Sequence, residues 1–179
     1  MEYGLKTDRL VLKPLSELDI AFIQELESRP ETYKYDWGTA LSADKIESGC
    51  RWFIEKQKSL PNGGAIRWIV IYDDKKIGEV HVDCINDKSH EWEIGWHILP
   101  EYWGKGFATE AVTAVIKHAF THFNIQRIVA VCHIENIKSI SLAKRVGMLK
   151  AGRMRESLLI NGIYYDEYVF SVFKHEVIK

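Results

Sequence analysis

Two glycines and a lysine lie where the sequence changes from a strand-like to a helical pattern. Residues 99–111 read LPEYWGKGFATEA, so Gly104, Lys105 and Gly106 directly precede the helical pattern. The first turn of a helix presents unpaired N–H groups and the positive end of the helix dipole. Glycines also let a phosphate approach the backbone closely. The segment therefore predicts an anion site; the alternative is a plain strand-to-helix connection in which the glycines only relieve strain.

Two familiar phosphate-binding loops do not fit this segment. A P-loop places its lysine after its second glycine, whereas Lys105 lies between the two glycines. The dinucleotide-binding fingerprint needs a third Gly or Ala at the position that Thr109 occupies. An anion site in this segment is therefore of another kind.

A second segment, residues 133–148, reads HIENIKSISLAKRVGM. Asn136 suits a helix N-cap and Gly147 suits a helix end, with Ser139 in the first turn between them. Taken alone, these residues describe an ordinary short helix. Together with residues 99–111 they form a much more specific pattern.

The histidines and cysteines give weaker signals. His118 and His122 have the i, i+4 spacing of zinc ligands, but the glutamate of a metalloprotease motif and an evident third ligand are missing, so no metal is expected. His81 and His97 lie on predicted strands and either contact a substrate or are ordinary sheet histidines. Widely spaced cysteines without a Cys-x-x-Cys pair predict buried, reduced thiols at Cys50, Cys84 and Cys132.

Alternating and helical patterns predict the elements that position these residues. The expected order is β-α-α-β-β-β-α-β-α-β-β, which indicates one α/β domain over residues 1–179 with a mixed, largely antiparallel sheet flanked by helices. The hairpin signal Ile160-Asn161-Gly162-Ile163 suits a two-residue turn. Strand patterns occupy residues 9–13, 65–72, 76–83, 91–99 and 127–133, and helical patterns follow Ser16, Ser42, Ala108 and Lys138.

Composition narrows the class of protein. The 179 residues carry 24 Lys and Arg against 25 Asp and Glu, a net charge of −1, which disfavours a nucleic-acid binder. The 46% of hydrophobic and 12% of aromatic residues exclude the disordered class. The sequence opens without an apolar leader, and no run of about 18 apolar residues follows, so a cytoplasmic protein without a membrane segment is expected.

Several segments along the chain form a larger pattern. They are residues 7–14 (TDRLVLKP), 93–96 (EIGW), 102–111 (YWGKGFATEA), 135–139 (ENIKS), 144–148 (KRVGM) and 161–166 (NGIYYD). Over nearly the whole chain, this pattern resembles the GNAT superfamily of N-acetyltransferases, and within it the RimJ/RimL-like branch of ribosomal-protein N-terminal acetyltransferases. The chain departs from the superfamily at Trp103, where the usual pyrophosphate motif begins with Gln or Arg.

The resemblance implies acetyl-CoA as the acetyl donor, with no metal. Backbone groups of Ile98 and Leu99 would meet the pantetheine amides, Asn136 would hold the pantetheine arm, and Ser139 would lie near the thioester sulfur. The loop and the first helical turn would cradle the pyrophosphate with backbone N–H groups. These loop residues are Gly104, Lys105, Gly106, Phe107, Ala108 and Thr109.

Acyl transfer to an amine needs an unprotonated nucleophile, a stabilised oxyanion and a protonated leaving thiolate. The resemblance puts Glu93 beside the cofactor, where a carboxylate in a partly dry cleft would act as general base. The alternative for Glu93 is a structural hydrogen bond. Ser139 is the candidate acid for the thiolate, or else a helix-capping hydroxyl. Leu158 occupies the position of a further acidic residue in some relatives, so the base stays open.

The expected acceptor is a primary amine, either a protein N-terminal α-amine or a small molecule such as a polyamine. Tyr33, Tyr35 and Trp37 are expected on one wall of its site, with Tyr164 and Tyr165 on the opposite wall and His81 near the cleft. Aromatic residues there would suit a core equally well. A non-catalytic acyl-CoA-binding sensor or interaction module is the alternative function, and a homodimer is compatible with the resemblance.

Overall fold

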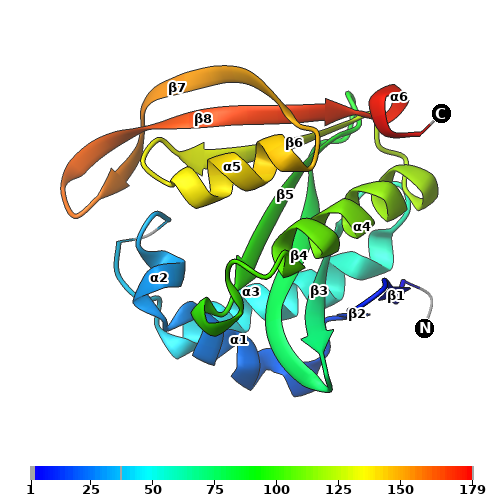
Figure 1. Ribbon diagram of the computed structural model, residues 1–179, viewed down its shortest axis with the longest axis horizontal. Coiled ribbons are helices and arrows are strands. Elements are labelled where there is room, and N and C mark those ends of the chain that lie inside the picture. The colour runs from blue at the N-terminus through cyan, green and yellow to red at the C-terminus, as the bar shows by residue number, and fades with distance from the viewer. Residues whose placement is uncertain (1–2, 37, 179) are drawn as a thin grey trace.

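The computed structural model of the protein describes residues 3–36 and 38–178. Within them one sheet of eight strands has the order β1-β2-β3-β4-β5-β6-β8-β7, and only β5 and β6 run parallel (Figure 1). The strands are β1 (Leu5–Lys6), β2 (Val11–Pro14), β3 (Ala65–Tyr72), β4 (Lys75–Asn86), β5 (Glu91–Ile98), β6 (Arg127–His133), β7 (Leu149–Ile160) and β8 (Ile163–Phe173).

Helices cover both faces of this sheet. α4 and α5 pack on one face, while α1 and α3 pack on the other, so that α4 crosses in front of β3 to β5 and α3 lies behind them in Figure 1. The α-helices are α1 (Ile20–Glu27), α2 (Pro30–Tyr33), α3 (Ala43–Lys56), α4 (Phe107–His122), α5 (Ile137–Arg145) and α6 (Lys174–Val177). Short 3-10 helices are η1 (Glu17–Asp19), η2 (Gln57–Ser59) and η3 (Pro100–Tyr102).

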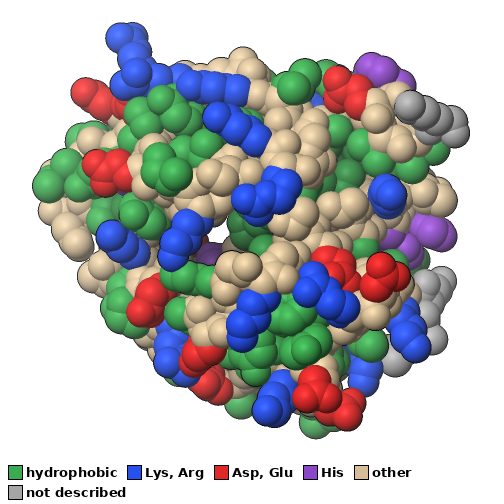
Figure 2. All heavy atoms as spheres, viewed as in Figure 1, with side chains coloured by type: hydrophobic (Ala, Val, Ile, Leu, Met, Phe, Trp, Pro, Cys, Tyr) green, Lys and Arg blue, Asp and Glu red, His purple; other side chains and the backbone are tan. Residues whose placement is uncertain are grey.

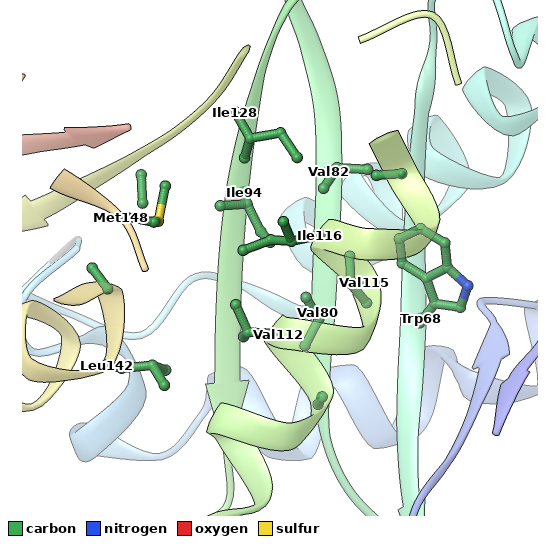
Figure 3. Close-up of a cluster of buried hydrophobic side chains, with 14 of the residues drawn as sticks. Trp68, Val80, Val82, Ile94, Val112, Val115, Ile116, Ile128, Leu142 and Met148 are labelled. Atoms are coloured by element: carbon green, nitrogen blue, oxygen red, sulfur yellow. The ribbon is translucent and has the colours of Figure 1, made fainter. Parts of the chain in front are cut away.

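The α4 face of the sheet is the larger apolar core. Val112, Val115 and Ile116 of α4 are buried against β4 and β5, which contribute Val80 and Ile94 (Figure 3). Burial of each such aliphatic side chain contributes about 1.5–3 kcal/mol relative to leaving it in water. This packing fixes the axis of α4 and therefore the place where its first turn begins.

The opposite face of the same strands carries a row of polar side chains. Strand residues alternate between faces, so Glu79 and His81 of β4 lie on the face opposite its buried Val80 and Val82. The register sets Glu79 opposite His97 of β5 and His81 opposite Gly95, while Arg67 of β3 lies on the other side of His81. Phe53 of α3 packs on both His81 and Arg67 on this face.

The parallel pair β5 and β6 is joined over a short length only. Glu91, Trp92 and Glu93 pair with β6, after which the two strands separate (Figure 1). Backbone groups and side chains beyond Glu93 therefore face a gap in the sheet, and this gap lies between the polar row and the first turn of α4.

The predicted α/β class and largely antiparallel sheet are confirmed, and the hairpin turn has the expected positive φ at Asn161 (50°) and Gly162 (81°). α4 begins at Phe107, one residue before the predicted start. The short β1, α2 and α6 were not predicted, because two to four residues carry too little periodicity. Among the described helices, none is long and apolar enough to cross a membrane.

Candidate active site

A large cleft opens where β5 and β6 separate. Its volume is about 2090 Å³, which exceeds the roughly 300–1,000 Å³ of ordinary small-molecule pockets. One end is lined by the start of α4 and by α5, and the other by the polar row and the segment that contains α2. In Figure 2 the opening lies in the middle of the face, with Lys and Arg side chains around it and a histidine visible inside. The cleft is large enough for two reactants.

The loop before α4 presents free backbone donors to the cleft. Gly104 and Gly106 have φ angles of 73° and 82°, a left-handed conformation that other residues adopt at a cost. The first intrahelical bond of α4 is donated by the Glu110 N–H to the Gly106 carbonyl, at 3.0 Å. The N–H groups of Phe107 and Ala108 therefore precede the helical hydrogen-bond ladder and are available to an anion. Gly104, Gly106, Phe107, Ala108 and Thr109 all line the cleft.

Arg9 adds a positive charge to this loop that sequence reasoning missed. Its Nε donates to Glu110 Oε2 at 2.7 Å, and Nη1 donates to the Lys105 carbonyl at 3.0 Å. Thr7 Oγ1 donates to Glu110 Oε1 at 2.6 Å. A Cβ atom on Gly106 would lie 3.3 Å from the Arg9 guanidinium, so this cation borders the anion site. The segment 7–14 was part of the resemblance, but spacing along the chain did not show that it reaches α4.

Two predicted cofactor contacts lie elsewhere than expected. Leu99 is buried in the core beneath α1 and α3, and its N–H donates to the Ile77 carbonyl at 2.8 Å, so it does not line the cleft. The Lys105 side chain is turned to the Glu101 carbonyl, 3.0 Å away, and is also outside the cleft lining. Ile98 does line the cleft, but its carbonyl accepts a 2.6 Å bond from the Trp103 indole.

α5 places two more predicted residues on the cleft. Asn136 is the N-cap of α5, and its Oδ1 accepts the Ser139 N–H at 3.2 Å. Asn136 and Ser139 both line the cleft, so capping and ligand contact are compatible. Lys138 lies 3.6 Å from the centre of the Trp103 ring, and Arg145 Nη1 donates to Thr109 Oγ1 at 3.2 Å. Three cations, Arg9, Lys138 and Arg145, thus surround the start of α4.

Glu93 lies at the other end of the cleft, as the last β5 residue that pairs with β6. Burial raises the pKa of its carboxyl group, and the neighbouring carboxylates of Asp83 and Glu167 raise it further. A raised pKa brings a carboxyl group closer to the range in which it exchanges protons at neutral pH.

A fully buried carboxylate organises the polar row. Glu79 is 0% exposed, and three cationic or imidazole groups meet it: His97 Nδ1 at 2.9 Å, His81 Nδ1 at 3.1 Å and Arg67 Nε at 3.5 Å. His97 Nε2 lies 3.1 Å from Asp36 Oδ2, in the segment that follows α2. Although burial alone would raise the pKa of Glu79, His81 and Arg67 hold it well below the ordinary range. Sequence reasoning did not single out Glu79, because a lone glutamate on a strand gives no signal.

The two partners of His97 keep this imidazole protonated. Burial alone would lower its pKa, but hydrogen bonds to Asp36 and Glu79 and their negative charges raise it to about 10. His97 therefore joins the sheet to the segment after α2 as a charged bridge.

The aromatic residues predicted for the acceptor wall divide into two groups. Tyr33 and Tyr35 line the cleft, and the Tyr35 ring packs at 5.1 Å from His133, which contacts Tyr165 on its other side at 4.7 Å. Tyr164 is 61% exposed on β8 and lies outside the cleft, because strand alternation turns it away from Tyr165. Trp37 lies outside the described residues.

The remaining candidates do not form a metal or redox site. No group of three His, Cys, Asp or Glu residues suited to a metal occurs among the described residues. Burial and the charge of His122 lower the pKa of His118 to about 4, and the two rings stack with their centres 4.1 Å apart. Cys50 and Cys132 are buried free thiols, and burial raises their pKa values to about 11 and about 12, whereas Cys84 is only partly buried.

The site is thus a cleft in a mixed sheet, where two parallel strands separate beside the N–H donors of a helix start. The family model described as "Acetyltransferase (GNAT) domain" matches residues 9–149, and the chain belongs to this family.

Known proteins similar to the chain carry acetyltransferase names. The uncharacterized N-acetyltransferase YoaA of Bacillus subtilis is 31% identical over 172 residues, which covers 95% of this chain and 96% of YoaA. The structure of Vibrio cholerae spermidine N-acetyltransferase with CoA and spermine superposes with a TM-score of 0.83 at 24% identity, covering 97% of this chain and all of that one (100%). RimL, a ribosomal α-N-protein acetyltransferase solved with coenzyme A, has a TM-score of 0.82 at 18% identity, covering 93% and 95%.

These two structures show the fold and do not single out one branch of the family. The spermidine enzyme and RimL superpose equally well, so the RimJ/RimL-like branch is not favoured over the polyamine branch. The acetyltransferase family is confirmed, and the choice of acceptor amine depends on the groups that line the cleft.

Proposed function

We propose that the protein is an acetyl-CoA-dependent N-acetyltransferase that transfers the acetyl group directly to a cationic primary amine. The observation that carries this proposal is the continuity of one cleft, which joins the N–H donors at the start of α4 to the polar row on β4 and β5. Family membership and the N-acetyltransferase name of YoaA support the same activity.

The donor end is suited to acetyl-CoA. The N–H groups at the start of α4 would bind the pyrophosphate, and Arg9, Lys138 and Arg145 surround this point with positive charge. Asn136 would bind the pantetheine arm through its amide, and Ser139 would protonate the departing thiolate. Ile98, which lines the cleft beyond the last pair of β5 with β6, would lie beside the arm.

The acceptor end is suited to a cation. It is lined by more carboxylates than cations, and Arg67 and His97 are already paired with buried or half-buried acids. This surplus of negative charge favours an amine that arrives as ammonium, such as a polyamine or a peptide N-terminus. Glu27 and Asp36 are the partners of Arg67 and His97, which leaves Glu31, Glu93 and Glu167 against Lys34 and Lys45.

The amine must lose a proton before it attacks the thioester carbonyl carbon. Glu93 and His81 both line the acceptor end of the cleft. Glu93, with its raised pKa, is the proposed carboxylate of this step: it either takes the proton or holds the ammonium as a counter-ion. Replacing Glu93 by Gln is expected to lower kcat/KM for the amine about 100-fold and to leave acetyl-CoA affinity unchanged.

Calorimetry with acetyl-CoA, followed by a thiol-release assay against a panel of amines, tests the proposal. The panel contains spermidine, spermine and a short peptide with a free N-terminus. Binding together with turnover of a panel amine is the expected result. Binding without turnover of any amine would favour the alternative, a non-catalytic acyl-CoA-binding module, and absence of acetyl-CoA binding would contradict both functions.

A second copy of the chain is the proposed protein partner. β7 forms one edge of the sheet, and exposed edges with apolar side chains favour pairing with another molecule. Sedimentation velocity at increasing concentration tests this, with a Leu159→Lys variant expected to shift the protein towards monomer. The exposed apolar side chains of β7 and β8 are Leu149, Met154, Leu159, Ile163 and Tyr164.

A further inference from the structure

His81 and His97 share one buried carboxylate but differ in their free nitrogens. Glu79 is ionised and 0% exposed, so its oxygens can only accept hydrogen bonds. The Nδ1 atoms of both rings lie within 3.1 Å of these oxygens and must therefore carry hydrogen. Nε2 of His97 also faces a carboxylate, Asp36, whereas among the described residues His81 bonds through Nδ1 alone.

The His81 ring lies over Gly95, at the point where β5 leaves β6. A Cβ atom on Gly95 would lie 2.3 Å from His81 Cε1 and 2.5 Å from Nε2. Gly95 is the first β5 residue after Glu93 on the same face, so the Nε2 edge of the ring lies at the start of the gap. The absence of a side chain at Gly95 is what allows the imidazole to reach this position.

We propose that His81 is the proton acceptor for the amine, with Glu79 as the positioning residue that fixes its tautomer. This inference rests on the proposed N-acetyltransferase function and divides the work at the acceptor end: Glu93 holds the ammonium, and His81 Nε2 takes its proton. His97, with hydrogen on both nitrogens, has no lone pair for this role.

The transfer proceeds through deprotonation of the ammonium, attack on the thioester and departure of the thiolate. The ammonium gives one proton to His81 Nε2, and the amine lone pair then forms the N–C bond to the acetyl carbonyl carbon. Collapse of the tetrahedral intermediate breaks the C–S bond, and the sulfur leaves with the electron pair. The second proton on nitrogen ends on this thiolate, by way of Ser139 or water, and His81 returns its proton to solvent.

Charged groups surround His81 on the neighbouring strands, whereas α3 contributes an apolar ring. Phe53 of α3 covers the ring at 5.3 Å and brings no charge. The charged groups around the ring include both carboxylates and cations. These groups are Glu79 and Asp83 on β4, Arg67 on β3, Glu93 and His97 on β5, and Glu27 on α1.

The central variant is His81→Ala, assayed with acetyl-CoA and the panel amine that the wild-type chain acetylates fastest. We expect kcat to fall about 100-fold or more, while the Kd for acetyl-CoA from calorimetry stays within about twofold. The acidic limb of the pH profile of kcat/KM for the amine should disappear. Added imidazole, which fits the vacated space, is expected to restore part of the rate. His175→Ala, an exposed histidine on α6, is the matched control.

Gly95→Ala tests the geometry independently. The new Cβ would displace the His81 ring, so this variant alone is expected to lose activity, whereas adding it to His81→Ala should cause no further loss. The three atoms nearest to the added Cβ all belong to His81, so the closest clash is with this ring.

Two results would overturn the assignment. One is a His81→Ala variant that keeps its acidic limb and loses less than about threefold in rate while Glu93→Gln abolishes that limb. The other is a nitrogen NMR spectrum of wild-type protein that shows hydrogen on Nε2, rather than Nδ1, of neutral His81. Failure of the wild-type chain to turn over any amine would instead contradict the proposed function, and the NMR result would still decide the tautomer.

Discussion

His97 differs from His81 by one additional carboxylate, and this difference predicts how stability depends on pH. Its pKa of about 10 lies above the ordinary value of about 6.5. A raised folded-state pKa gives stability that is fully present below about pH 6.5 and is lost as the pH rises through about 10.

For His97→Gln we expect a loss of about 3 kcal/mol in the free energy of unfolding at pH 6, because Glu79 and Asp36 lose a charged partner. At pH 9 the loss should shrink to about a third of this value. Urea denaturation at both pH values measures it, with His175→Gln as a control without pH dependence. An equal loss at pH 6 and pH 9 would show that the bridge is not charged.

We expect acetyl-CoA binding at the anion site to depend on the single backbone position of Gly106. In Gly106→Trp, the indole would enter the space in front of the α4 N–H groups, and we expect the Kd for acetyl-CoA to rise more than about tenfold, which is about 1.4 kcal/mol. Calorimetry measures this directly. Gly162→Trp is the matched control, since Gly162 has a similar φ of 81° and open space around it in the distant hairpin turn. Equal affinities in both variants would contradict the loop assignment.

At the scale of elements, the N-terminal strands are tied to the start of α4. Arg9 bonds both Glu110 on α4 and the carbonyl of Lys105 in the loop. We expect Arg9→Gln to weaken acetyl-CoA binding by about three- to tenfold, because the loop loses both a nearby cation and a restraint. Calorimetry measures the change, and Lys6→Gln, an exposed position on β1, controls for net charge. A similar effect in both variants would mean that only total charge matters.

The sequence predicted those elements that carry long regular patterns, and it could not predict where two elements meet. Alternation along β3 to β5 and the period of α4 were sufficient for the sheet and its main helix. The separation of β5 from β6 leaves no mark in the sequence, because it depends on which backbone groups pair. For the same reason, the inward turn of Leu99 and the burial of Glu79 appeared only in three dimensions.

In the candidate site, positions that depend on local backbone conformation were the easiest to predict from the sequence. Gly104, Gly106 and Asn136 lie on the cleft, since glycine conformation and helix capping are local properties. Long or exposed side chains were predicted less well: Lys105 turns to a carbonyl of its own loop, and Tyr164 points away from the cleft. Their directions depend on neighbours that are distant in sequence.

At the scale of the whole molecule, the net charge of −1 is the sum over two cleft ends of opposite local charge. Cations surround the start of α4, while carboxylates line the acceptor end of the same cleft. Each reactant therefore meets a local field that differs from the average field of the chain.

The response of the two KM values to salt separates local from net charge. Raising NaCl from about 0.1 M to 1 M shortens the screening length from about 10 Å to 3 Å. We expect KM to rise severalfold for both acetyl-CoA and the cationic amine, because each loses attraction to its own end. Control by the net charge of −1 would instead lower KM for acetyl-CoA, since salt would then screen a repulsion.

Two charge-removing variants complete this salt experiment. Arg9→Gln should reduce the salt dependence of KM for acetyl-CoA only, and Glu31→Gln, which removes an exposed carboxylate from the acceptor end, should reduce that of the amine only. Each variant is the control for the other, since both change one charge on the cleft. If either variant altered both dependences equally, the two ends would not be electrostatically separate, and the cleft would have to be treated as one field.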